Sequence, residues 1–196
     1  MLDRKSKMIF SKRIFDITAA AVLIILFSPL FAVVAISIFA TSPGAVVYRS
    51  KRIGRANQPF FMHKFRTMKR NTPQVATHLL ANADAYLTPI GSFLRKTSLD
   101  ELPQLLDVLM GTMSLVGPRP ALYNQYDLVA MRTERGIDSL TPGITGWAQI
   151  NGRDELPIPQ KVELDFYYLC HRSILFDLQI VVLTVAQVLR RDGVKH

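Results

Sequence analysis

The chain has 196 residues, enough for one compact unit with its own core and too few for two large lobes. Its formal net charge of +9, together with a hydrophobic content of 49%, indicates an anionic membrane surface or a phosphorylated ligand as the partner, with nucleic acid as a further candidate. The single cysteine, Cys170, excludes an internal disulfide and a cysteine metal site, and we expect it to be a buried thiol.

An uncharged apolar stretch occupies residues 17–40, ITAAAVLIILFSPLFAVVAISIFA, and has about the length that spans a bilayer. Ser28 and Pro29 lie at its middle and divide it into two arms, each reaching roughly 18 Å at 1.5 Å per residue. Proline removes a backbone donor and clashes one turn back, so it favours a bend at this point.

Basic residues flank this apolar stretch on both sides. They are Arg4, Lys5, Lys7, Lys12 and Arg13 before it, and Arg49, Lys51, Arg52 and Arg55 after it. The positive-inside tendency would keep both flanks in the cytoplasm, which a straight crossing cannot do. We therefore favour a re-entrant helical hairpin bent at Ser28 and Pro29, while a kinked spanning helix and a buried soluble helix remain alternatives.

Residues 45–68 contain two β-favouring runs around a turn at 54–57, which predicts a basic β-hairpin. Lys64 and Arg66 are two positions apart, so in a strand they would point to the same side and could bind one anion. The simpler alternative is a solvated strand face. Residues 69–90 are predicted to be a loop with a short helix.

The segment LRKTSLDELPQ, residues 94–104, allows two interpretations. Ser98 and Glu101 have the spacing of a capping box, which needs no function. Pro103 argues against that frame, because proline prefers the first helical position and would start the helix near Leu102. Asp100 and Glu101 would then stand just before a helix N-terminus, where backbone donors attract phosphate. From these residues alone both interpretations stay open.

A phosphate site needs cations for the oxygens, a metal ligand, and a nucleophile or base. Arg95, Lys96, Asp100 and Glu101 supply residues of all three kinds. Mg²⁺ suits such a site because it binds one or two carboxylates together with substrate phosphates and keeps its waters. An aspartate can also attack phosphorus directly and form an acyl phosphate.

The remaining pattern is mainly helical. A helix is predicted from about Leu102 to Gly111, with an apolar face made of Leu102, Leu105, Leu106 and Leu109. A rigid turn at 117–120 precedes another helical segment. The Gly- and Pro-rich residues around Trp147 predict a long ordered loop. The final helix, residues 173–191, either lies in the membrane interface or packs on the core.

Several motifs in this order resemble the bacterial sugar transferase family, the small monotopic phosphoglycosyl transferases that load a sugar phosphate onto a polyprenyl phosphate carrier. The motifs are SKRIFD before a helix broken at SP, then KFRTM, SLDELPQ, MSLVGPRP, PGITGWAQINGR, VELDFYYL and DLQIVVLTVAQVLRR. They cover nearly the whole chain, and their common order is far more specific than any one of them alone.

The resemblance implies that Asp100 is the nucleophile that attacks the β-phosphorus of a UDP-sugar, so that UMP leaves and a phosphosugar stays on the enzyme. Polyprenyl (undecaprenyl) phosphate then takes up the phosphosugar in a ping-pong reaction that initiates glycan synthesis. Glu101 would assist metal or proton handling, and Mg²⁺ would bind at Asp100. Arg95 would hold phosphate, and Arg119 and Arg153 match family positions that contact phosphate or nucleotide.

The fold class expected on these grounds is α+β and mainly helical. Residues 1–42 would form a basic flank and a re-entrant membrane helix-break-helix, and residues 43–196 a cytoplasmic catalytic domain with a small β-hairpin and interfacial amphipathic helices. We expect the chain at the cytoplasmic face of the bacterial inner membrane, with the lipid bilayer as a partner, without nucleic acid, and with a homodimer left open.

One residue departs from the family pattern. Family members often carry an aspartate in GDMS, whereas this chain has Thr112. If that acid helps to hold metal, its replacement weakens the inference. Two other functions compete with transfer: a membrane-tethered basic binding module without catalysis, and a hydrolase that splits nucleotide sugars with water.

Overall fold

The computed structural model describes residues 2–70, 72, 83–152 and 156–190. It begins with one continuous helix, α1 (Leu2–Thr41), which contains Pro29. Because Pro29 has no N–H, the carbonyl of Ile25 loses its helical donor. The Ser28 hydroxyl donates to this same carbonyl, with Oγ 2.8 Å from Ile25 O. The predicted helix-break-helix is therefore corrected to one unbroken helix, since a side chain replaces the missing bond.

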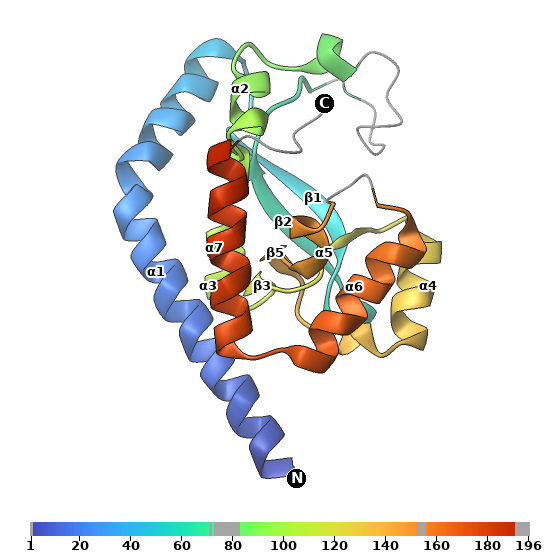
Figure 1. Cartoon of the computed structure of the whole chain (residues 1–196). Coiled ribbons are helices and arrows are strands. Elements are labelled where there is room, and N and C mark those ends of the chain that lie inside the picture. The colour runs from blue at the N-terminus through green and yellow to red at the C-terminus, as the bar shows by residue number, and fades with distance from the viewer. Residues whose placement is uncertain (1, 71, 73–82, 153–155, 191–196) are drawn as a thin grey trace.

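The helix α1 nevertheless bends, and it packs in two separate places. Figure 1 shows it running along one side of the molecule and then changing direction toward α2. Before Pro29, Ala20 is fully buried in the main core; after Pro29, Val34 and Ile38 are buried in a second cluster with Phe65. Within the described residues, Phe10–Thr41 is the one segment long and apolar enough to cross a membrane.

The predicted hairpin is confirmed. Strands β1 (Val47–Ile53) and β2 (Pro59–Phe65) pair antiparallel around the short 3₁₀ turn η1 (Arg55–Asn57). A two-residue strand, β4 (Ala121–Leu122), adds to the other edge of β1. This pairing brings the segment after the Gly117–Pro120 turn beside the hairpin.

Three short helical elements follow: η3 (Ala83–Tyr86), α2 (Gly91–Lys96) and η4 (Leu99–Glu101). The next helix, α3 (Gln104–Met110), ends at Gly111, whose φ of 90° suits glycine. Leu105 and Val108 are buried, whereas Leu106 is 45% exposed. The predicted apolar face of α3 was therefore wrong at Leu106 and lacked Val108.

The region predicted as one long loop contains regular structure. Strand β5 (Gly143–Thr145) pairs in parallel with β3 (Ser114–Val116), and α5 (Trp147–Ile150) follows directly. The backbones approach closely, because a Cβ added at Gly143 would lie 2.1 Å from the nitrogen of Gly117. Gly143 looks like a loop residue in the sequence, but the close approach of the two strands leaves no space for a side chain at this position.

The last part of the chain is helical: α4 (Tyr126–Glu134), the turn η5 (Ile137–Ser139), α6 (Ile158–His171) and α7 (Ile174–Arg190). The mainly helical α+β class is confirmed. The expected burial of Cys170 was wrong, because this thiol is exposed. The buried face of α6 carries Val162, Asp165 and Tyr168, and Cys170 lies outside it.

Polar contacts fasten α1 to the rest of the molecule. Asp16, 3% exposed, accepts a bond from the Ser114 hydroxyl at 2.8 Å, and Lys12 Nζ lies 2.9 Å from Asp16 and 2.8 Å from Asp177 of α7. Arg13 donates to the carbonyls of Val108 and Leu109 at the C-terminus of α3, at 2.5 and 2.8 Å. The SKRIFD motif thus fixes α1 against α3, β3 and α7.

Candidate active site

The adjacent acids Asp100 and Glu101 lie in η4, immediately before α3. Pro103 stands at the N-cap of α3, so the helix begins just after the proline. Ser98 has a left-handed backbone (φ 57°) and makes no capping bond, which rules out the capping-box frame. The sequence argument based on proline is confirmed, and the two acids lie in the short 3₁₀ helix η4, outside α3.

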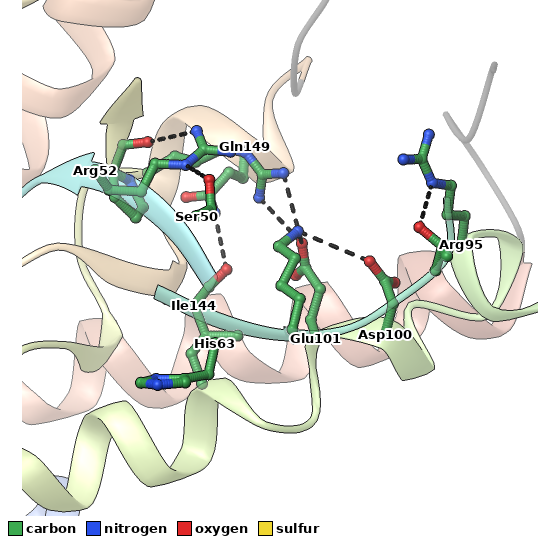
Figure 2. Close-up of polar contacts among 12 residues, drawn as sticks. Ser50, Arg52, His63, Arg95, Asp100, Glu101, Ile144 and Gln149 are labelled. Carbon is green, nitrogen blue, oxygen red and sulfur yellow. Dashed lines mark hydrogen bonds and ion pairs between the residues drawn. The ribbon is translucent and has the colours of Figure 1, made fainter. Parts of the chain in front are cut away.

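Lys64, near the end of β2, joins the two acids. Its Nζ lies 2.6 Å from Glu101 Oε1 and 3.8 Å from Asp100 Oδ2. Figure 2 shows the side chains of Asp100 and Glu101 pointing to the same side of the chain, with Arg95 beyond Asp100. One ammonium group therefore contacts both carboxylates.

Contacts between β2 and α3 hold Lys64 in this position. Asp107 of α3, fully buried, accepts two bonds from His63: the backbone N–H at 2.8 Å and a ring contact from Nδ1 to Oδ1 at 2.6 Å. His63 precedes Lys64, and adjacent strand residues point to opposite faces. His63 is thus anchored to α3 while Lys64 reaches the acids.

Arg119, in the turn 117–120, approaches the acid pair from another element. Its Nη1 and Nη2 lie 3.4 and 3.5 Å from Glu101 Oε1, the same oxygen that contacts Lys64. Arg95, in the last turn of α2, donates from Nε to the Thr67 hydroxyl at 3.0 Å and exerts an electrostatic influence on Asp100. Three cations from three elements therefore surround two carboxylates.

The two carboxyl groups differ in their pKa values. Burial raises the pKa of Asp100, and Glu101 raises it further, while Lys64, Arg95 and Arg119 act in the opposite direction. Burial also acts to raise the pKa of Glu101, but Lys64 and Arg119 outweigh it and lower that pKa to about 2. Glu101 is held as a permanent anion by its ion pairs, whereas Asp100 is a less stabilised and more basic carboxylate.

The structure does not bring every predicted phosphate ligand together. Arg66 does not join Lys64: its Nη2 and Nη1 donate to the carbonyls of Ser42 and Pro43, at 2.6 and 2.9 Å, just after α1 ends. The two residues diverge because β2 ends at Phe65, so strand alternation no longer relates them. Arg153 lies outside the described residues.

The donor set at the acid pair fits a Mg²⁺ ion bound chiefly through substrate. Among the described residues no group of three or more His, Cys, Asp or Glu side chains could hold a metal. Asp100 contacts Lys64 at 3.8 Å and receives no hydrogen bond from the described residues, so its oxygens can serve as ligands. One or two carboxylates together with phosphates and waters make a normal Mg²⁺ shell.

Thr112 stands at the other end of α3 from the acid pair. It is exposed, and its hydroxyl donates to the carbonyl of Asp107 at 3.2 Å. Its place beyond Gly111 puts it beside the C-terminal carbonyls of α3 that Arg13 caps. The departure from the family pattern therefore lies outside the acid site.

Sequence reasoning missed the residues that hold the site without touching its centre. Asp107, His63 and Thr67 fix Lys64 and Arg95, and Arg132 supports the backbone at Arg119. One signal in the sequence could have found Asp107. It interrupts the leucine pattern of α3, and an acid among apolar helix residues is typical of a buried carboxylate with a partner.

The chain belongs to the bacterial sugar transferase family, whose pattern matches residues 7–191. It is 41% identical over 187 residues to EpsL of Bacillus subtilis, described as an uncharacterized sugar transferase, covering 94% of this chain and 90% of that protein. It is 42% identical over 182 residues, 89% of this chain, to a UDP-glucose:undecaprenyl-phosphate glucose-1-phosphate transferase of Escherichia coli. It is 38% identical over 193 residues, 95% of this chain, to a UDP-N-acetylgalactosamine-undecaprenyl-phosphate N-acetylgalactosaminephosphotransferase of Aeromonas hydrophila. The chain spans only 39% and 45% of these last two proteins.

Proposed function

We propose that this chain transfers a sugar-1-phosphate from a UDP-sugar to undecaprenyl phosphate and releases UMP, thereby initiating the synthesis of a polysaccharide. The observation that carries the proposal is the position of Asp100, a basic carboxylate without hydrogen-bond donors among the described residues, beside Lys64, Arg95 and Arg119. The names of the two relatives that state an activity supply the donor and acceptor classes. Because those names differ in the sugar, the donor sugar is left open.

In the proposed reaction an Asp100 oxygen attacks the β-phosphorus of the UDP-sugar. The Asp100 O–P bond forms, the bond from that phosphorus to the bridging oxygen breaks, and UMP leaves with the bridging oxygen. A phosphate oxygen of undecaprenyl phosphate then attacks the same phosphorus, which forms the lipid diphosphate sugar and releases the Asp100 carboxylate. A covalent step of this kind divides one difficult displacement into two.

The cations of the site have distinct parts in this scheme. Lys64 and Arg119 neutralise Glu101 and supply positive charge at the place where the diphosphate would bind. Among the described residues Arg95 donates from Nε to Thr67, and we expect the outer edge of its guanidinium to bind a phosphate oxygen. Mg²⁺, bound at Asp100 and the diphosphate, would neutralise phosphate charge.

We further propose that α1 is a re-entrant membrane helix, bent but unbroken, and that the site lies at the cytoplasmic face of the inner membrane. Large apolar side chains are exposed on several helices. They are Val22, Ile25, Leu26, Val33, Ile36 and Phe39 on α1, Phe93 on α2, Leu106 and Met110 on α3, and Leu175, Leu178, Val182, Val185 and Leu189 on α7. A bent α1 that returns to pack beside Phe65 suits a segment that enters and leaves the bilayer on one side.

The decisive experiment follows UMP release and covalent labelling by purified protein in detergent or nanodiscs. With a panel of UDP-sugars, Mg²⁺ and no lipid, we expect one donor to give at most one UMP per protein and a phosphosugar adduct on Asp100, detected by mass spectrometry. Adding undecaprenyl phosphate should start turnover, while Asp100→Asn should give neither adduct nor turnover. EDTA should abolish both in the wild type.

Other outcomes would identify the competing functions. Sustained UMP release without lipid would indicate a hydrolase, and wild-type protein without UMP release from any donor would indicate a binding module. The re-entrant path of α1 is tested separately in a Cys170→Ser background that carries Ser11→Cys or Thr41→Cys. An impermeant maleimide should label neither cysteine in intact spheroplasts and both after lysis, whereas labelling of only one before lysis would show a crossing helix.

A further inference from the structure

The backbone of the turn that carries Arg119 is held by three other elements. Arg132 Nη1 donates to the carbonyl of Arg119 at 2.9 Å, and Arg52 Nη1 donates to the carbonyl of Pro120 at 3.3 Å. The N–H of Gly143 donates to the carbonyl of Pro118 at 2.9 Å. Three consecutive carbonyls thus accept hydrogen bonds from α4, β1 and β5. These bonds fix the backbone of the turn and therefore the direction in which the side chain of Arg119 projects from it.

The contact from Arg132 differs from the other two because its donor is itself fixed by a buried anion. Arg132, 8% exposed on α4, donates from Nε and Nη2 to Oδ2 of Asp165 on α6, at 3.0 and 2.6 Å, and Asp165 is 1% exposed. One edge of the guanidinium is therefore occupied by Asp165, and Nη1 is directed at the carbonyl of Arg119. A rigid, planar guanidinium can make these contacts together, which an ammonium cannot.

Holding α4 against α6 does not require this arrangement. A buried ion pair is expensive to desolvate, and a well-packed apolar pair of similar volume stabilises a fold equally well or better. Arg135, the C-cap residue directly after α4, also joins this helix to α6 through an exposed pair with Glu163 at 2.5 Å. Among the described residues, Arg135 contacts Glu163 and Phe166 of α6 and not the turn. The buried pair adds the hydrogen bond from Arg132 to the carbonyl of Arg119. Asp165 also belongs to the VELDFYYL motif, to which the proposed reaction assigns no catalytic role.

We propose that Arg132 and Asp165 form a positioning unit that sets the Arg119 guanidinium against Glu101. Arg132 acts through the carbonyl of Arg119, and Asp165 acts through Arg132. The inference rests on the proposed function only where it assigns Arg119 to the substrate phosphates; the geometry of the turn is independent of the reaction.

The test compares one substitution at two sites, Arg132→Lys and Arg135→Lys. Both replace an arginine that pairs α4 with α6, but only the first contacts the turn. Hydrogen exchange of a peptide covering residues 117–121, measured on the full chain in detergent, should quicken about tenfold in Arg132→Lys and stay unchanged in Arg135→Lys. Equal exchange in both variants and the wild type would overturn the inference.

A second readout separates positioning from general stability. An Arg132→Met/Asp165→Leu variant keeps an apolar contact between the helices, so it should fold while losing the bond to the turn. In an Arg119→Lys background, which no longer presents the guanidinium, this double substitution should reduce UMP release far less than in the wild type. An equal proportional loss in both backgrounds would mean that the pair only stabilises the fold and would overturn the inference. If the wild type released no UMP, the proposed function would fail, and the hydrogen-exchange comparison would still decide the positioning role.

Discussion

Lys64 and Glu101 are separated by 37 positions in the sequence and are joined at 2.6 Å in the fold. This contact links the β-hairpin to the turn before α3, and it brings an ammonium group to within 3.8 Å of Asp100 as well. The same lysine therefore stabilises the negative charge of both acids. Its removal is the most direct way to change the protonation of the proposed nucleophile without changing the nucleophile itself.

Lys64→Met should move the acid limb of the pH–rate profile to higher pH. The proposed nucleophile is ionised Asp100, so the rate falls as pH drops through its pKa, which burial already raises. Lys64 lowers that pKa, and removing Lys64 raises it further, so activity is lost at a higher pH than in the wild type. The measurement is UMP release against pH, with Lys51→Met on the neighbouring strand as the control. An acid limb that stays in place would show that Lys64 does not control Asp100.

Ser28→Ala should destabilise the protein by about 1 kcal/mol. Pro29 has no N–H to donate to the carbonyl of Ile25, and the substitution also removes the hydroxyl, so this carbonyl is left without a donor. Ser37→Ala is the matched control. Its hydroxyl also bonds a carbonyl, that of Val33 at 2.8 Å, but the helix already supplies an N–H there. Unfolding in detergent measures both. In a Pro29→Ala background, where the N–H returns, Ser28→Ala should cost almost nothing; a cost that persisted there would contradict the explanation.

Arg13→Gln should lower the free energy of unfolding by about 2 kcal/mol, since two carbonyls at the C-terminus of α3 lose a charged donor. Arg49→Gln, which removes an exposed arginine, should have an effect within about 0.5 kcal/mol. Denaturant titration in micelles gives both values. Equal stability of the two variants would mean that the contact between α1 and α3 is dispensable.

Thr112→Asp should leave the rate of UMP release within about twofold of the wild type, because residue 112 is exposed beyond the far end of α3. Thr112→Asn serves as the uncharged comparison. A rate increase of tenfold or more in the aspartate variant alone would show that an acid at this position takes part in the reaction.

The local parts of the site were predictable from the sequence, and the contacts between distant segments were not. Pro103 indicates where α3 begins, and this frees Asp100 and Glu101 from a capping role. The hairpin follows from its two β-favouring runs. The sequence alone could not place Lys64 on Glu101, because that contact depends on how β2 packs on α3 through His63 and Asp107.

Three expectations failed for related reasons. Arg66 was paired with Lys64 on the assumption that the strand continues, yet β2 ends at Phe65. The strand β5 was missed because its pairing with β3 is parallel and distant in the sequence, and its glycines look like loop residues. Cys170 was expected inside because cysteine is usually buried, but its position on α6 faces outward. In each case tertiary packing outweighed a local tendency.

The attachment of α1 to α3 has a consequence for the lipid environment. Sliding α1 by one turn, about 5.4 Å, would break the contacts of Arg13 and withdraw Asp16 from Ser114. The helix therefore cannot adapt to a thicker or thinner bilayer by moving on its own, as an independent membrane anchor can. If α1 is inserted as proposed, a change in bilayer thickness must be met by deformation of the surrounding lipid or by movement of the whole protein. In the proposed membrane position of the protein, we expect bilayer thickness to change the depth of Asp100 relative to the lipid headgroups.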